Sequence, residues 1–275
     1  MPICQICPRG CQLKEGQVGF CRARACQNGA IVPINYGQAT SVALDPIEKK
    51  PLYHFYPGSK ILSYGSFGCN LRCPFCQNYQ ISMAGQNQIV HQYIAPRELV
   101  ALAVKLALEP AGNLGVAFTY NEPLICPEYI KDCAVLLKEA GLKTVLVSNG
   151  HVNNAAFNEI LPFIDAINID LKGFSQKYYD YVGGNLECVK QNIAAAYGKC
   201  HVEVTTLIVP TKNDELAEME AEAKWLATIS PEIPLHISRY FPRYQCEIPT
   251  TPTDTIYRLH DEARKYLKFV HIGNC

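Results

Sequence analysis

The stretch Gly65-Ser-Phe-Gly-Cys-Asn-Leu-Arg-Cys-Pro-Phe-Cys-Gln-Asn78 contains three cysteines in the spacing C-x3-C-x2-C. They are Cys69, Cys73 and Cys76, and an aromatic residue, Phe75, stands directly before the last of them. Structural zinc sites and ordinary four-iron clusters usually take four protein ligands, and no fourth Cys or His follows closely here. Three thiolates on one tight loop can hold three irons of a four-iron–four-sulfur cluster and leave the fourth iron open to a small molecule. The spacing predicts such a cluster, with structural zinc as the alternative.

The composition is that of a soluble globular protein of 275 residues, with 48% apolar and 18% charged residues. Lys and Arg number 25, as do Asp and Glu, so the net charge of zero gives no argument for nucleic acid or an anionic membrane. The amino terminus lacks the basic and apolar regions of a signal peptide, and no apolar run is long enough to span a bilayer. We expect a cytoplasmic protein.

Fourteen cysteines without an export signal favour metal chemistry in a reducing compartment over a disulfide framework. A second group of them, Cys4, Cys7, Cys11 and Cys21, lies in a glycine-rich segment that is too short to build a core unaided. We therefore expect a small metal-stabilised unit over residues 1–45, ahead of a core at 46–275. Four thiolates suit zinc or an auxiliary iron–sulfur cluster equally, and reduced cysteines without a metal are the remaining alternative.

From about residue 60, short apolar runs alternate with amphipathic ones, which predicts a parallel α/β domain with right-handed crossovers. About six repeats are too few for a complete eight-stranded barrel, and the chemistry is expected at the carboxyl ends of the strands. The expected strands are 60–64, 115–119, 144–148, 166–171, 202–209 and 235–238. The expected helices are one from Pro96 and others at 127–140, 174–181, 185–197, 213–229 and 254–267, before a short apolar run at 269–272.

Polar residues follow or end several of these strands. Phe118-Thr-Tyr-Asn-Glu-Pro123 follows the second strand, and Ser148 and Asn149 follow the third. Asn168, Asp170 and Lys172 alternate along the fourth, so they share one face, where burial is costly without a partner or ligand. Glu203 and His236 lie on the next two strands. The structural alternatives are a helix cap for Glu122, solvated outward-facing side chains for the fourth strand and an ordinary core histidine for His236.

Two further stretches narrow the interpretation. Cys76-Gln-Asn-Tyr-Gln-Ile-Ser82 follows the cysteine loop, and Asp45-Pro-Ile-Glu-Lys-Lys-Pro-Leu-Tyr-His-Phe-Tyr-Pro-Gly58 precedes it. Together with the three cysteines and the cysteine-rich start, they resemble the radical S-adenosylmethionine (SAM) family. The resemblance is closest to the radical SAM enzymes of the AmmeMemoRadiSam system, which are relatives of pyruvate formate-lyase activating enzyme. It implies a partial (β/α)6 TIM-like barrel with the small cysteine-rich extension in front.

The resemblance also implies an activity. A four-iron–four-sulfur cluster on Cys69, Cys73 and Cys76 would bind SAM at its open iron and cleave it reductively to a 5′-deoxyadenosyl radical. That radical would abstract hydrogen from a substrate, for which a protein is one candidate. The family's glycine-rich SAM motif is replaced here by Tyr120 and Asn121, while Glu122 remains as a partner for the SAM ammonium. The residues expected to bind the cofactor are Phe75, Asn78, Tyr120, Asn121, Glu122, Ser148, Asn149, Asp170, Lys172, Glu203 and His236.

Such chemistry runs without oxygen and calls for an electron donor such as flavodoxin or ferredoxin, with a protein substrate or partner subunits as further expected contacts. Neither a membrane nor a nucleic acid is indicated as a partner. Two other classes of function stay open from the sequence. One is an electron-transfer iron–sulfur protein, which needs no SAM pocket. The other is a zinc-stabilised binding module with zinc at both cysteine groups.

Overall fold

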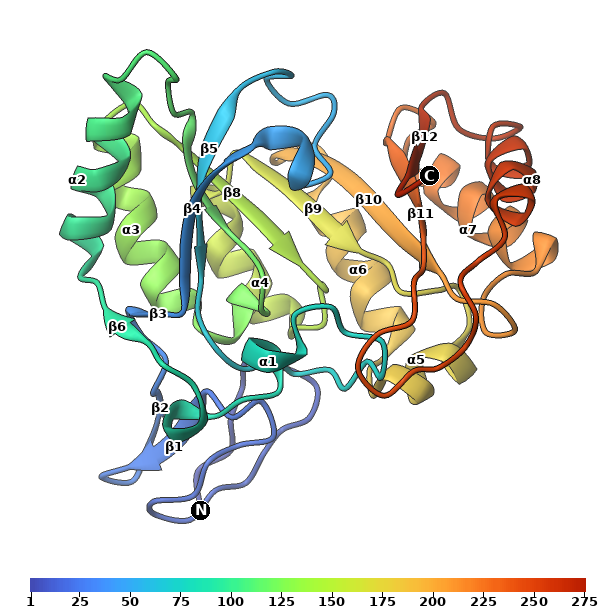
Figure 1. Ribbon diagram of the computed structural model, residues 1–275. Helices are drawn as coiled ribbons and strands as arrows, with labels where there is room; N and C mark the ends of the chain where they lie inside the picture. The colour runs from blue at the N-terminus through green and yellow to red at the C-terminus, as the bar shows by residue number, and fades with distance from the viewer.

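One eight-stranded sheet organises the computed structural model, which describes residues 1–275 (Figure 1). Its strand order is β12-β11-β10-β9-β8-β7-β5-β4, and all neighbours pair in parallel except β4 with β5. The two edge strands, β4 and β12, do not pair, so the barrel stays open. The strands are β4 (Ser41–Pro46), β5 (Lys60–Gly65), β7 (Gly115–Phe118), β8 (Lys143–Ser148), β9 (Ala166–Asp170), β10 (His201–Ile208), β11 (Leu235–Arg239) and β12 (Val270–Gly273).

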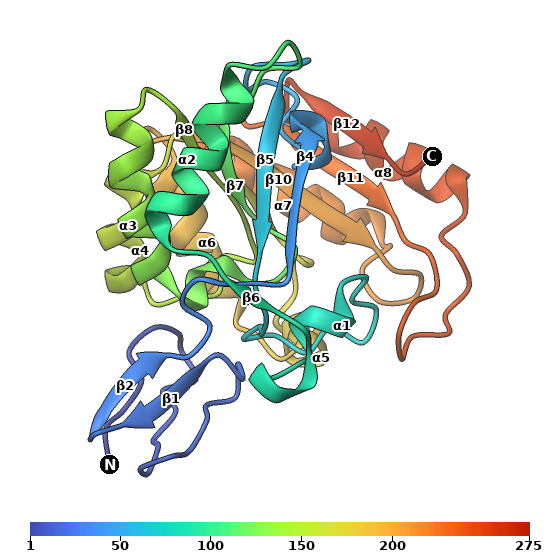
Figure 2. The same cartoon turned by 60° about the vertical axis from the view of Figure 1, so that its left-hand side comes forward.

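Helices cover the outer face of this curved sheet (Figures 1 and 2). A core of 49 buried residues includes strand residues such as Val116, Leu146, Ile167 and Val204, which face the helices. This two-layer packing confirms the expected α/β fold and partial barrel. The helices are α1 (Tyr79–Ser82), α2 (Pro96–Ala107), α3 (Pro127–Glu139), α4 (Asn154–Ile160), α5 (Gln176–Val182), α6 (Leu186–Ala196), α7 (Leu216–Ile229) and α8 (Thr253–Ala263).

The inner face of the sheet is covered at its amino end by residues 47–59, here called the plug segment. Ile47 and Leu52 from this segment are fully buried against Ile61, Ala117 and Val145 of the sheet. The plug segment therefore fills the half of the inner face from which the parallel strands start. Only the carboxyl end of the inner face is left for a ligand.

A small unit at the amino terminus lies beside the carboxyl end of the sheet (Figure 2). Its regular structure is one antiparallel pair, β1 (Arg24–Gln27) and β2 (Ala30–Pro33). A second short pair, β3 (Gln38–Ala39) with β6 (Gln92–Tyr93), connects it to the loop before α2. The sequence-based boundary at residue 45 falls inside β4, which is a strand of the main sheet.

The expected strands are all present, within one residue of their predicted ends. The predicted run at 269–272 joins the sheet as β12, whereas β4 was not predicted. The helix expected from residue 213 begins at Leu216. Asn213 lies in the preceding loop because its side chain donates to the carbonyls of Lys172 and Leu207 and accepts from the amide of Val209. No helix combines the length and the apolar character that a membrane span requires.

Glu222 on α7 is a fully buried carboxyl group behind the sheet. The hydroxyl oxygen of Thr206 lies 2.5 Å from Glu222 Oε1 and 3.0 Å from the carbonyl oxygen of Leu171. One hydroxyl hydrogen can serve only one of these acceptors, so a protonated Glu222 completes the arrangement by donating to Thr206. Burial raises the pKa of Glu222 to about 8, which keeps the group neutral near pH 7.

Replacing Glu222 with glutamine should therefore change how stability depends on pH. The unfolded chain ionises this carboxyl above about pH 4.5 and the folded chain only above about pH 8, so wild-type stability falls between these values. We expect Glu222→Gln to lack this loss, which the two pKa values put at about 4 kcal/mol by pH 8. Urea unfolding at pH 5 and pH 8 measures the difference. Glu220→Gln, on the surface of the same helix, is the matched control. If the free energy of unfolding changes equally between pH 5 and pH 8 in Glu222→Gln and wild type, the expectation is contradicted.

Candidate active site

The three predicted cysteines lie on the loop after β5 and line one cavity of about 290 Å³ at the carboxyl end of the sheet. None of them forms a disulfide. The amide of Cys69 donates to the carbonyl of Cys21 at 3.2 Å, and the amide of Arg72 donates to that of Val182 at 2.8 Å, so both sides of the loop are fixed. The amide of Leu71 lies 3.4 Å from the sulfur of Cys69, a contact that favours the thiolate. Burial raises the pKa of the Cys73 thiol to about 11 in the absence of a metal.

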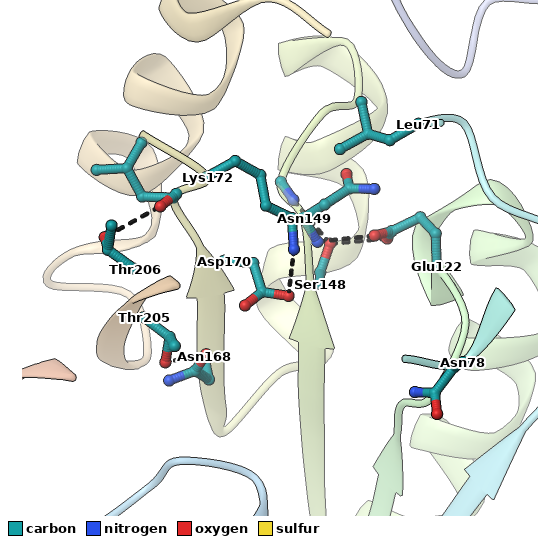
Figure 3. A network of polar contacts seen from close by, with 12 residues as sticks. Leu71, Asn78, Glu122, Ser148, Asn149, Asn168, Asp170, Lys172, Thr205 and Thr206 are labelled. Carbon is teal, nitrogen blue, oxygen red and sulfur yellow. Dashed lines mark hydrogen bonds and ion pairs between the residues drawn. The ribbon is translucent and has the colours of Figure 1, made fainter. Parts of the chain in front are cut away.

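Glu122 lies on the wall of the same cavity and is fully buried (Figure 3). Its carboxylate accepts from the Ser148 hydroxyl at 2.7 Å and from the Asn149 amide at 2.7 Å. It also accepts from the amide of Leu124 at 2.9 Å, so it caps the short helix η3 (Pro123–Ile125) as well. Burial raises the pKa of Glu122 to about 7 against the effect of these donors. The capping role and the cavity-lining role therefore coexist in one side chain.

Asn149 connects this carboxylate to the cysteine loop. Its side-chain nitrogen donates to Asn70 Oδ1 at 2.9 Å and lies 3.6 Å from the sulfur of Cys69. Asn149 lines the cavity, whereas Ser148 supports Glu122 from behind and does not. The strand-end residues of β7 and β8 are thereby joined to the first cysteine of the loop.

Asp170 and Lys172 face the cavity from the end of β9 and form an ion pair of 3.0 Å (Figure 3). Burial alone would lower the pKa of Lys172, but the Asp170 carboxylate raises it, so the ammonium stays charged. Asn168, one pleat repeat lower, does not line the cavity. It donates to the carbonyl of Pro51 at 2.8 Å and accepts from Thr205, so it holds the plug segment.

Tyr120 occupies a left-handed backbone conformation, with φ of 71°, in the wall of the cavity. Such a conformation is unfavourable for a tyrosine and requires support from its surroundings. The Tyr120 hydroxyl donates to Asp45 Oδ2 at 2.6 Å, and the same carboxylate is paired with the buried ammonium of Lys50 at 2.9 Å. The carbonyl of Tyr120 accepts from the Asn78 side chain at 2.8 Å. The Asp45–Lys50 part of the sequence motif thus anchors the segment that leads into Glu122.

Asn121 and Phe75 also line the cavity. The Asn121 side chain donates to the carbonyls of Phe67 and Gly68 and accepts from the amide of Ser66 at 3.0 Å, which ties it to the loop before Cys69. Phe75 is buried beside Tyr178 and Tyr240, with ring centroids 6.4 and 6.3 Å away. These rings shield the cysteine loop from water on one side.

Glu203 and His236, predicted to bind the cofactor, do not line the cavity. They lie toward the amino ends of β10 and β11, below the cavity. There Glu203 accepts from His236 at 2.6 Å, from His201 at 2.8 Å, and from the backbone amides of Tyr53 and His54. Alternation along the strand places both residues on the inner face as expected, but one pleat repeat too low. Their role in this structure is to attach the plug segment.

Residues 64–226 match the family model of the radical SAM superfamily. The chain belongs to the radical SAM superfamily. Membership implies a four-iron–four-sulfur cluster and SAM, and it supports SAM-cleaving radical chemistry. Three unpaired thiols, a buried carboxylate and a charged lysine around one cavity of about 290 Å³ are a donor set that fits both groups.

Relatives place the chain within this superfamily. An uncharacterized protein of Methanocaldococcus jannaschii, MJ0808, is 38% identical over 98% of this chain and 80% of its own length. The pyruvate formate-lyase-activating enzyme of Clostridium pasteurianum is 29% identical over 54% of this chain and 61% of its own. The match to the Clostridium pasteurianum enzyme confirms the predicted relationship to the activating enzymes. The narrower assignment to the AmmeMemoRadiSam system stays a prediction.

Solved radical SAM structures share the fold at low sequence identity. A radical SAM methyltransferase from Sphaerobacter thermophilus has a TM-score of 0.62 and 15% identity, over 79% of this chain and 67% of that one. Streptococcus suis SuiB bound to S-adenosylmethionine has a TM-score of 0.58 and 14% identity, over 75% of this chain and 48% of that one. Both likenesses support the partial barrel.

Sequence reasoning missed several radical SAM cavity residues and supports. Ser238 ends the inner-face alternation of β11, so the strand-end rule applied to that strand would have found it. The sequence does not show that Asn70, inside the cysteine loop, contacts Asn149. It also does not show that Asp45, paired with Lys50 in the motif before the loop, contacts Tyr120. Other lining residues that were not predicted are Leu71, Gln77, Ser82, Met83, Thr119, Val147, Leu207 and Asn274.

The position of Glu203 leads to a prediction that separates a structural role from a cofactor role. Burial raises the pKa of Glu203, but four hydrogen-bond donors outweigh it and hold the pKa at about 2. Its contribution to stability is therefore present above about pH 4.5 and lost as the pH falls toward 2. We expect Glu203→Gln to lower the free energy of unfolding at pH 7 by about 2–4 kcal/mol, because the amide nitrogen meets donors. SAM affinity of the folded fraction should be unchanged.

Urea unfolding and SAM titration of the same preparation measure both quantities. Glu247→Gln, at an exposed position, is the matched control. If Glu203→Gln binds SAM more weakly but is as stable as wild type, Glu203 contributes to cofactor binding and the structural role is wrong.

Proposed function

We propose that Cys69, Cys73 and Cys76 ligate the cluster of this enzyme and that SAM binds across the remaining cavity. The observation that carries the proposal is that these three unpaired thiols share one cavity with Glu122, Asp170 and Lys172. When bound, the cluster and SAM supply one-electron reductive cleavage to a 5′-deoxyadenosyl radical, which abstracts hydrogen from a substrate. An electron-transfer protein without SAM chemistry would have no use for this convergent polar set.

The chain's own residues then have distinct tasks. Glu122 accepts hydrogen bonds from the SAM ammonium, whose charge favours the ionised carboxylate and lowers its pKa from about 7. Lys172 is the one cationic side chain among the cavity-lining residues, and we assign it to the SAM carboxylate. Asp170 orients Lys172 through the 3.0 Å ion pair and can accept from a ribose hydroxyl. Phe75 and its neighbouring tyrosines exclude water from the cysteine loop.

The shape of the inner face bears on the substrate. Below the cavity, the plug segment covers the inner face of the sheet through apolar contacts and the hydrogen bond from Asn168 to the carbonyl of Pro51. At the mouth, Gln77, Asn78 and Asn274 line the cavity and are exposed to solvent. We propose that the substrate is presented from outside, as an exposed segment of a protein. The relative named as a pyruvate formate-lyase-activating enzyme supports this class without identifying the target.

Two further contacts belong to this proposal. Reduction of the cluster calls for a one-electron donor of the flavodoxin or ferredoxin class. The amino-terminal group Cys4, Cys7, Cys11 and Cys21 is proposed to bind a second metal, zinc or an iron–sulfur cluster, because the four side chains line one small cavity.

The reaction class is tested with anaerobically purified protein, reconstituted with iron and sulfide, reduced with dithionite and supplied with SAM. Wild type should release 5′-deoxyadenosine, and Cys73→Ala should release at least about a hundredfold less, because one cluster ligand is lost. Cys133→Ala, a buried cysteine on α3 away from the cavity, is the matched control and should retain activity. A fully loaded, reduced wild-type protein that neither binds nor cleaves SAM would overturn the proposal.

The assignment of Lys172 predicts a selective loss of SAM affinity. Removing a charge-assisted hydrogen bond costs about 1.5–3 kcal/mol, so Lys172→Met should bind SAM roughly 10- to 100-fold more weakly. The titration follows the change that SAM causes in the paramagnetic resonance spectrum of the reduced cluster. Lys177→Met, at an exposed position on α5, should bind SAM like wild type. If Lys172→Met and wild type bind SAM with equal affinity, Lys172 does not contact SAM and the assignment is wrong.

A further inference from the structure

The amino-terminal cysteines lie around a small cavity in a unit with little regular structure. Cys4, Cys7, Cys11 and Cys21 all line it, and three of the four are buried. The cavity measures about 10 Å³, which has room for one atom-sized guest and favours a single ion such as zinc over a larger cluster. In this structure no three of these side chains are close enough together to bind one metal ion. The sulfur atoms must therefore turn toward the cavity when a metal binds. The same holds for the three-cysteine loop.

Positive charge is gathered at this cavity. Arg9 and Arg24 both line it, and Arg24 is only 5% exposed. Arg24 makes two hydrogen bonds with Glu128, of 2.7 and 3.0 Å, but its buried Nε has no partner. A divalent metal held by four thiolates carries a net charge of −2. Arg9, together with Arg24, whose charge Glu128 partly balances, suits such an anionic centre better than it suits four neutral thiols.

The unit is attached directly to the three-cysteine loop. The carbonyl of Cys21 accepts the amide of Cys69 at 3.2 Å. Gly68, with φ of +89°, packs so closely on this carbonyl that any side chain there would collide with it. One cysteine of the amino-terminal group is therefore in backbone contact with one cysteine of the other group.

Phe20, next to Cys21, forms a second attachment. Its ring lies between two guanidinium groups, with the carbon of Arg9 3.3 Å and that of Arg72 3.7 Å from the ring centroid. Arg9 donates to the carbonyl of Asn70, and Arg72 donates to that of Cys69, both at 3.0 Å. Arg72 also donates to the carbonyl of Phe20. Arginine–aromatic stacking and these backbone contacts fix the loop against the amino-terminal unit.

We infer that Cys4, Cys7, Cys11 and Cys21 bind a thiolate-coordinated metal, and that this metal braces the three-cysteine loop through Cys21 and the Arg9–Phe20–Arg72 stack. The inference rests on the proposed cluster at the three-cysteine loop. Without the metal, Cys21 keeps its apolar contacts with Phe67 and Ile125 but loses its link through the ion to Cys4, Cys7 and Cys11, in a unit whose regular structure is two short strands. The Cys69 amide contact with Cys21 is then less firmly held, and the loop takes up its cluster less readily.

The first measurement counts metal in a full-length chain whose loop cysteines are removed, Cys69→Ala/Cys73→Ala/Cys76→Ala, purified without oxygen. We expect one zinc per chain by elemental analysis; about four irons with sulfide would instead identify a cluster at the same thiolates. Adding Cys7→Ser should abolish this metal. Adding Cys26→Ser, a buried cysteine of the same unit that does not line the cavity, should not. Folding of each variant is checked by circular dichroism, and a folded parent variant without metal overturns the assignment.

The second measurement tests the brace in the chain with its loop cysteines intact. With iron withheld, Phe20→Ala should retain the amino-terminal metal, while Cys69, Cys73 and Cys76 are alkylated about tenfold faster than in wild type. Cys7→Ser should show the same rate, and Cys26→Ser should behave as wild type. Unchanged alkylation in both Phe20→Ala and Cys7→Ser overturns the brace. Failure of the loaded wild type to cleave SAM would overturn the proposed function alone, since neither measurement here depends on catalysis.

Discussion

The apolar inner face of an open parallel sheet must be covered, and this requirement determines where the cavity of this protein can form. Apolar strand residues such as Ala117 and Val145 face inward and must be buried. The plug segment covers them at the amino end, with Ile47 and Leu52 as its apolar contacts. Because this end is filled, the cavity can form only at the carboxyl end, where the loops carrying the cysteines and Glu122 converge.

The contacts that hold the plug segment are polar and buried. Asn168 binds the carbonyl of Pro51, Glu203 binds the amides of Tyr53 and His54, and Asp45 pairs with Lys50. Each of these polar groups would be costly to bury without a partner. The plug segment and the inner face therefore supply each other's hydrogen-bond partners. Asp45 also holds Tyr120, so the floor of the barrel and the wall of the cofactor cavity share one carboxylate.

Most of the fold could be predicted from the sequence because each strand is a short apolar run between turn signals. β4 was missed because it is an antiparallel edge strand with exposed residues, and only its pairing with β5 reveals it. Glu203 and His236 were predicted from their strands alone, and a residue's strand does not say how far it lies from the strand's carboxyl end. Glu203 is five residues before the end of β10, which is roughly 16 Å at 3.3 Å per residue. Asp170 ends β9 and reaches the cavity.

The anchoring of the plug segment has a consequence for the order in which the chain becomes structured. The amides of Tyr53 and His54 meet their acceptor 150 and 149 residues later in the chain. A ribosome therefore releases this segment long before the strand that fastens it has been made. Until β10 takes its place, the apolar inner surface of the first strands lacks its final cover. Closure of the barrel floor belongs to the late, long-range steps of folding, and a nascent chain at this stage is the form most exposed to aggregation.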